Sequence, residues 1–107
     1  MSTFDKREDS FENKFAHDAA LQFKVAARRN KLLGLWVAGL MGLDAAAAAE
    51  YAKSVVVADL AEAGDEDVFR KVRGDLDAKG VEQSDHQIRR TMDELLAEAK
   101  NQIQTEG

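Results

Sequence analysis

Apolar side chains recur every three or four residues along most of this chain, which is the pattern of helices that bury one face. The first series predicts a helix over about residues 18–41 and consists of Leu21, Val25, Leu32, Leu35 and Trp36, with Arg28 at the same three- and four-residue spacing. A second helix is predicted over about 44–63. It opens with an alanine run, and alanine has the highest helix propensity. It continues through Tyr51, Ala52, Val55, Val56 and Leu60.

Two shorter periodic series follow. The first predicts a helix over about 66–79 with Val68, Phe69, Val72 and Leu76 on its inner face. The second predicts a helix over about 85–103 and consists of Ile88, Met92, Leu95, Leu96, Ala99 and Ile103. Residues 104–107 carry no further apolar position, so we expect them to form a frayed tail.

The residues between these series are typical helix ends. Gly42, Gly64 and Gly80 are expected to end the first three helices, because glycine adopts the left-handed conformation that often follows a helix. Asp44 and Asp65 are predicted N-caps, and Ser84 with Gln87 forms a capping box. No proline interrupts the pattern. Four helices with short connections predict an all-α antiparallel four-helix bundle over residues 18–107.

Residues 1–17 differ from the rest, because charged and polar residues dominate them. Phe4, Phe11 and Phe15 are their large apolar side chains after Met1, and spacings of seven and four place all three on one helix face. This composition predicts a mobile N-terminal docking segment that lays its phenylalanines into a partner's groove. The alternative is an ordinary helical extension that packs on the bundle.

Composition narrows the class of protein. The 107 residues suffice for one small domain, and the absence of cysteine excludes disulfides and thiolate metal sites. A net charge of −5 argues against a dedicated nucleic-acid binder. The start lacks the pattern of a secretory signal, and the most apolar stretch, residues 32–43, is shorter than the roughly 20 residues of a membrane span. We therefore expect a cytoplasmic protein with no membrane insertion.

Candidate chemistry is sparse. His17 and His86 each lie at a predicted helix start without a second ligand at helical spacing, so we expect no metal site. The sequence carries no phosphate-binding loop or nucleophile motif, which predicts a protein that is not an enzyme.

A basic cluster on the first helix comprises Lys24, Arg28, Arg29 and Lys31, and Arg89 with Arg90 forms a second pair. Lys24, Arg28 and Lys31 share one side of the helix, while Arg29 points elsewhere. These groups either bind phosphate or neutralise the acidic surface of residues 44–67, and the second interpretation is favoured. Trp36 and Tyr51 either stack on an adenine or belong to the core, and the core is favoured. Phosphate binding with stacking would make the protein an adenine-nucleotide sensor, which is the alternative function.

Five stretches of the chain are distinctive, in this order between residue 1 and about residue 96: MSTFDKREDSFENKFAHD, LQFKVAARRNKLLGLW, AEYAKSVVVADL, GDEDVFRKVRGDLDAKGV and SDHQIRRTMDELL. Together they resemble the zeta subunit family, small bacterial inhibitors of the F-type ATP synthase. The resemblance implies a four-helix protein whose mobile N-terminus inserts between an alpha and a beta subunit, near the rotor stalk. Insertion there blocks ATP hydrolysis.

The resemblance also implies partners and site residues. The partners are the alpha, beta and gamma subunits of the catalytic head, so the protein would be cytoplasmic and associated with the membrane-bound enzyme. The partner-binding residues expected in the segment are Phe4, Lys6, Arg7, Phe11, Lys14 and Phe15. No cofactor is required. The resemblance implies weak ATP or ADP binding, and the residues that we assign to it are Lys24, Arg28, Arg29, Arg89 and Arg90.

Overall fold

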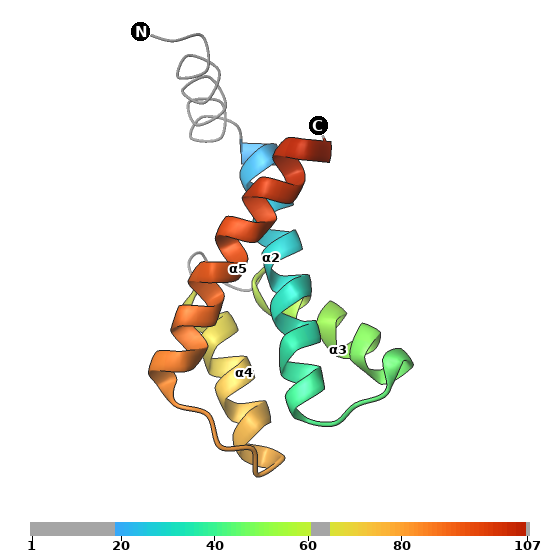
Figure 1. Ribbon diagram of the computed structural model, residues 1–107, viewed down its shortest axis with the longest axis vertical. Coiled ribbons are helices and arrows are strands. Elements are labelled where there is room, and N and C mark those ends of the chain that lie inside the picture. Colours follow the sequence, from blue (N-terminus) through green and yellow to red (C-terminus); the bar gives the residue numbers. More distant parts are fainter. Residues whose placement is uncertain (1–18, 61–64, 107) are drawn as a thin grey trace, which may run out of the picture.

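The computed structural model describes residues 19–60 and 65–106. This part of the chain forms four α-helices and no strand: α2 Ala19–Leu40, α3 Ala45–Ala58, α4 Glu66–Ala78 and α5 Asp85–Glu106 (Figure 1). The predicted all-α fold and its four helices are confirmed. The predicted glycine end at Gly64 lies outside the described residues.

Helix α2 is the central element and packs against α3, α4 and α5. The two long helices, α2 and α5, run side by side, and α4 lies beside the first half of α5 (Figure 1). The main apolar cluster draws on all four helices, with Leu33, Val55, Val72 and Ile88 among its buried members. A smaller cluster around Val25, Ala99 and Ile103 involves only α2 and α5. The apolar core therefore involves all four helices at one end of the bundle and only α2 and α5 at the other.

Several predicted core positions are confirmed. The four inner-face residues predicted for α4 are all buried: Val68, Phe69, Val72 and Leu76. Trp36 and Tyr51 pack, partly buried, against the main cluster. The Tyr51 hydroxyl donates a 2.7 Å hydrogen bond to Asp75. Burial and then this contact raise the pKa of Tyr51 above its usual value. Both rings therefore serve the core, as the favoured interpretation expects.

The predicted helix ends at Gly42 and Gly80 are confirmed by backbone geometry. Both glycines have positive φ, +74° and +71°. The amide of Leu43 donates to the carbonyl of Ala38 at 3.0 Å, and Gly42 donates to Gly39 at 3.2 Å. This pair of bonds is the Schellman arrangement, which satisfies carbonyls left open at the helix end. It turns the chain so that α3 folds back against α2.

Two of the three predicted N-cap residues make the expected side-chain hydrogen bond. The Asp44 carboxylate accepts a 2.8 Å hydrogen bond from the amide of Ala47, and the Ser84 hydroxyl accepts one of 3.0 Å from Gln87, as predicted. Asp65 occupies the N-cap position of α4, as predicted, but its side chain makes no capping hydrogen bond and accepts one from Arg29 of α2 instead.

Two predicted helix ends were wrong. The helix predicted to reach residue 63 ends at Ala58, and the following Asp59 is held by Asn30 of α2. The predicted frayed tail is helical through Glu106, because Arg28 binds Gln102 and Glu106 at this end. In both cases a residue at the helix end contacts α2, which a local sequence pattern does not record.

The helices α2 and α3 cross in close contact at Gly34. A Cβ atom built on Gly34 would lie 2.6 Å from the Cα atom of Ala52 and 3.1 Å from its Cβ. Because the obstacle is backbone, neither helix could make room by turning a side chain. Gly34 therefore sets how closely the two helices approach.

Candidate functional site

The residues expected to bind a partner lie outside the described residues. They are Phe4, Lys6, Arg7, Phe11, Lys14 and Phe15, and His17 lies outside with them. The described chain begins at Ala19, which is also the first residue of α2. The N-terminal segment therefore joins the bundle at the start of α2.

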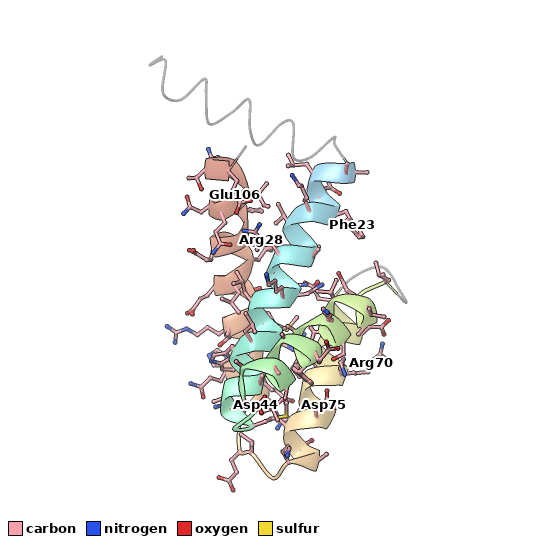
Figure 2. The ribbon with its side chains drawn as sticks, turned by 90° about the vertical axis from the view of Figure 1, so that its right-hand side faces the viewer. Phe23, Arg28, Asp44, Arg70, Asp75 and Glu106 are labelled. Atoms are coloured by element: carbon pink, nitrogen blue, oxygen red, sulfur yellow. The ribbon has the colours of Figure 1, made fainter. Side chains whose placement is uncertain are left out.

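Arg28 ties α2 to the end of α5. Its Nη1 atom donates to Gln102 Oε1 and to Glu106 Oε1, both at 2.7 Å, and Nη2 donates to Glu106 Oε2 at 3.0 Å. The two side chains point toward each other between the helices (Figure 2). A guanidinium held by both carboxylate oxygens is a strong and directional contact. It raises the pKa of Arg28 and lowers that of Glu106, in each case mainly through hydrogen bonding.

Replacing Arg28 by methionine should raise the pKa of Glu106 toward its ordinary value, because the hydrogen bond to Arg28 is the largest cause of the lowering. A lowered folded-state pKa contributes stability above the ordinary value, which is lost as the pH falls through the lowered one. NMR titration of the Glu106 carboxyl carbon measures both pKa values. The control is Arg90→Met, because Arg90 lies on α5 and pairs with Glu94 and not with Glu106. An equal Glu106 pKa in wild type and Arg28→Met would contradict this assignment.

Arg29 lies in a buried polar network. It is 2% exposed, and its Nε atom donates a 2.7 Å hydrogen bond to Asn30 Oδ1. Its Nη2 donates to Asp65 Oδ1 at 2.8 Å, and Asn30 Nδ2 donates to Asp59 Oδ2 at 2.9 Å. Adjacent residues of α2 thus hold the end of α3 and the start of α4. Buried polar groups need such partners, because an unpaired one costs about 1–3 kcal/mol.

The two arginines of α5 also meet carboxylates. Arg89 donates to both oxygens of Glu66, at 3.1 and 3.4 Å, and its guanidinium lies 3.9 Å from the centre of the Phe69 ring. Arg90 Nε donates to Glu94 at 3.0 Å. Arg29 and Arg89 each pair with an acid of residues 44–67, as the favoured neutralisation interpretation expects. The four arginines assigned to a nucleotide are therefore each bound to an acidic side chain: Arg28, Arg29, Arg89 and Arg90.

Lys24, the remaining residue assigned to a nucleotide, lines an open groove between α2 and α3. The groove has a volume of about 740 Å³. It is lined by Phe23, Lys24, Ala27, Arg28, Lys31, Leu35, Ala49, Ala52, Lys53, Val56, Val57 and Ile103. Lys24, Arg28 and Lys31 share it, which confirms that they lie on one side of α2.

The sequence interpretation missed the apolar part of this groove. Phe23 was outside the apolar series predicted for α2, and it is 57% exposed (Figure 2). Leu35, which belonged to that series, is 40% exposed, while the buried face runs through Arg29 and Leu33. A second stripe at four-residue spacing, Phe23–Ala27–Lys31–Leu35, was the available signal.

Two further observations concern sites of other kinds. Within residues 19–60 and 65–106, no three histidine, cysteine or acidic side chains are grouped so that they could hold a metal ion. None of the helices in the described ranges has the length and apolar character needed to cross a membrane.

Comparison with known proteins gives matches to solved structures and to a family profile. A solution NMR structure is 49% identical in sequence, with a TM-score of 0.72 over 81% of this chain and 99% of that one. No curated protein matches the chain. The family profile of ATPase inhibitor subunit zeta matches residues 1–102, which include both the N-terminal segment and almost the whole bundle. The chain therefore belongs to the ATPase inhibitor subunit zeta family.

Proposed function

We propose that this protein inhibits ATP hydrolysis by inserting its N-terminal segment, folded as a helix, at an alpha/beta catalytic interface of the F-type ATP synthase, near the rotor stalk. The observation that carries the proposal is the family match, which begins at residue 1 and so includes the segment with Phe4, Phe11 and Phe15. An inhibitory role follows from the family, and the interface and the residues are the proposal.

The energetics of the segment suit insertion into a partner. A lone helix of about 15 residues is marginal in water, so it gains by folding against another protein. Each phenylalanine buried there contributes about 1.5–3 kcal/mol, which offsets the ordering entropy. Such a helix spans about 22 Å, enough to reach into a subunit cleft. A wedge of this size would prevent the cleft from opening and closing during catalysis.

The charged residues of the segment complete the proposed contact. Lys6, Arg7 and Lys14 would pair with acidic groups of the alpha, beta or gamma subunits. The bundle would act as the anchor from which the segment extends. This role fits a helix α2 that is held along its length by α3 and α5.

The proposal is tested by comparing the full-length protein with a form lacking residues 1–17 as inhibitors of ATP hydrolysis by the matching ATP synthase. We expect inhibition by the full-length protein and its loss on truncation, because the inserted helix is gone. Circular dichroism is used to check that the truncated bundle still folds. Full inhibition by a folded truncated form would place the inhibitory surface on the bundle and refute the proposal.

A further inference from the structure

The exposed apolar surface of the described residues gathers at the α2–α3 groove. Four large apolar side chains are exposed in this part of the chain: Phe23, Leu35, Val57 (63%) and Leu60 (61%). The first three line the groove, and Leu60 lies beside Phe23 and Val56 in a hollow that adjoins it. Exposed apolar side chains that occur singly are unremarkable, but a contiguous patch marks an interaction surface.

The groove is also electropositive, in a chain whose net charge is −5. Its lining includes Lys24, Arg28, Lys31 and Lys53 and no carboxylate. Arg28 is neutralised by Glu106, and Lys53 lies 3.5 Å from Glu50 in a pair that is about three-quarters exposed, which is worth little. Lys24 and Lys31 are exposed and neither forms a direct ion pair with a described residue, although Lys24 is near enough to Glu106 to help lower its pKa. The three lysines of the groove are therefore available to a partner, while Arg28 is not.

The shape suits a helix. Along α2 the groove extends from Phe23 to Leu35, a separation of twelve positions that corresponds to a rise of about 18 Å. An amphipathic helix of about three turns covers that length, with its apolar anchors on one face and charged residues at the edges. A second copy of the chain fits poorly, because a symmetric contact through this groove would set lysines against lysines.

We propose that the α2–α3 groove holds an acidic amphipathic helix of the ATP synthase, which would give the bundle a docking surface separate from the N-terminal segment. The proposal rests on the proposed function for the identity of the partner. Apolar side chains of that helix would pack on Phe23, Leu35 and Val57. Carboxylates along its edges would pair with Lys24, Lys31 and Lys53 and would bring the bundle to the enzyme by long-range attraction.

The groove is tested first with two synthetic helical peptides, stapled so that they stay folded. Both carry leucines at i, i+3, i+4 and i+7, and their polar faces carry either glutamates or lysines. Titrated into the ¹⁵N-labelled full-length protein, the glutamate peptide should shift the NMR signals of groove residues such as Phe23, Lys31 and Val57. The lysine peptide should not. Absence of shifts with the glutamate peptide, or equal shifts with both, would overturn the proposal, as would groove signals that move with ATP alone.

The second test uses the matching ATP synthase and a variant with Lys31→Glu and Lys53→Glu. Its matched control is Lys79→Glu with Arg90→Glu, which changes the net charge equally at the residue after α4 and on α5. We expect the groove variant to bind the enzyme about tenfold more weakly, with a reduced dependence on salt and unchanged maximal inhibition. The control should bind as wild type does. Thermal unfolding followed by circular dichroism is used to check that both variants fold.

The outcomes separate this proposal from the proposed function. Equal binding by the groove variant and its control, with inhibition intact, would overturn the groove alone. Peptide binding in the groove without any inhibition by the wild-type protein would refute the proposed function and leave the groove standing. Stronger inhibition by the groove variant would indicate that the N-terminal segment itself occupies the groove. A change in its sedimentation would indicate a second copy, and either result would overturn the proposal.

Discussion

Replacing both Phe11 and Phe15 by alanine in the full-length protein should raise the concentration needed for half-maximal inhibition of ATP hydrolysis by at least about a hundredfold. Each buried phenylalanine contributes about 1.5–3 kcal/mol, and about 1.4 kcal/mol corresponds to a tenfold change in affinity. The helix itself should not weaken, because alanine favours helix formation. A loss of inhibition would therefore report the loss of the anchors.

The control for this variant comes from the same segment. In the proposed inserted helix, Ser2 and Asn13 would fall on the face opposite the phenylalanines, since Asn13 is nine residues, or about half a rotation, away from Phe4. The double variant Ser2→Ala and Asn13→Ala should inhibit as wild type does. Equal potency of the two double variants in steady-state hydrolysis assays would show that the phenylalanine face makes no contact of consequence.

Replacing Gly34 by alanine should lower the free energy of unfolding by about 1–3 kcal/mol. The new methyl group would meet the Ala52 Cα atom at 2.6 Å, so α2 and α3 must move apart along their crossing. The separation would also loosen the packing of Val55, which is 3.3 Å from the same position. For a domain of this size, each kcal/mol lowers the melting temperature by about 4–8 °C, which thermal unfolding by circular dichroism resolves.

Gly39→Ala provides the matched control, because it makes the same substitution in the same helix. A Cβ atom on Gly39 would meet nothing within 4 Å, and the residue is exposed. Alanine there should raise the free energy of unfolding by about 0.5–1 kcal/mol, owing to its helix propensity alone. The two substitutions should therefore shift the melting temperature in opposite directions. Stabilisation by both would mean that the two helices are not in close contact at Gly34.

Structural features that depend on residues close together in the sequence were predictable from the sequence. The four helices, the N-caps Asp44 and Ser84 and the glycine ends at 42 and 80 all follow from side-chain spacing and backbone preference. The errors concern residues that contact α2 from a distance. The side chain of Asp65, the N-cap residue of α4, binds Arg29, 36 positions earlier, and not its own helix. The last helical turn of α5 persists because Glu106 binds Arg28, 78 positions earlier. No local pattern records such a contact.

The candidate sites also combine features set by the local sequence with features set by contacts between distant residues. The sequence by itself determined which residues are basic, which helix face carries Lys24, Arg28 and Lys31, and the resemblance that the family match confirms. Only the tertiary structure decided that four arginines are occupied by carboxylates while the lysines beside Phe23 and Val57 are left to line an open groove. The physical reason is that a charge or an apolar side chain becomes a binding group through what lies across from it. That partner is chosen by how the helices pack, and local helix propensity does not specify it.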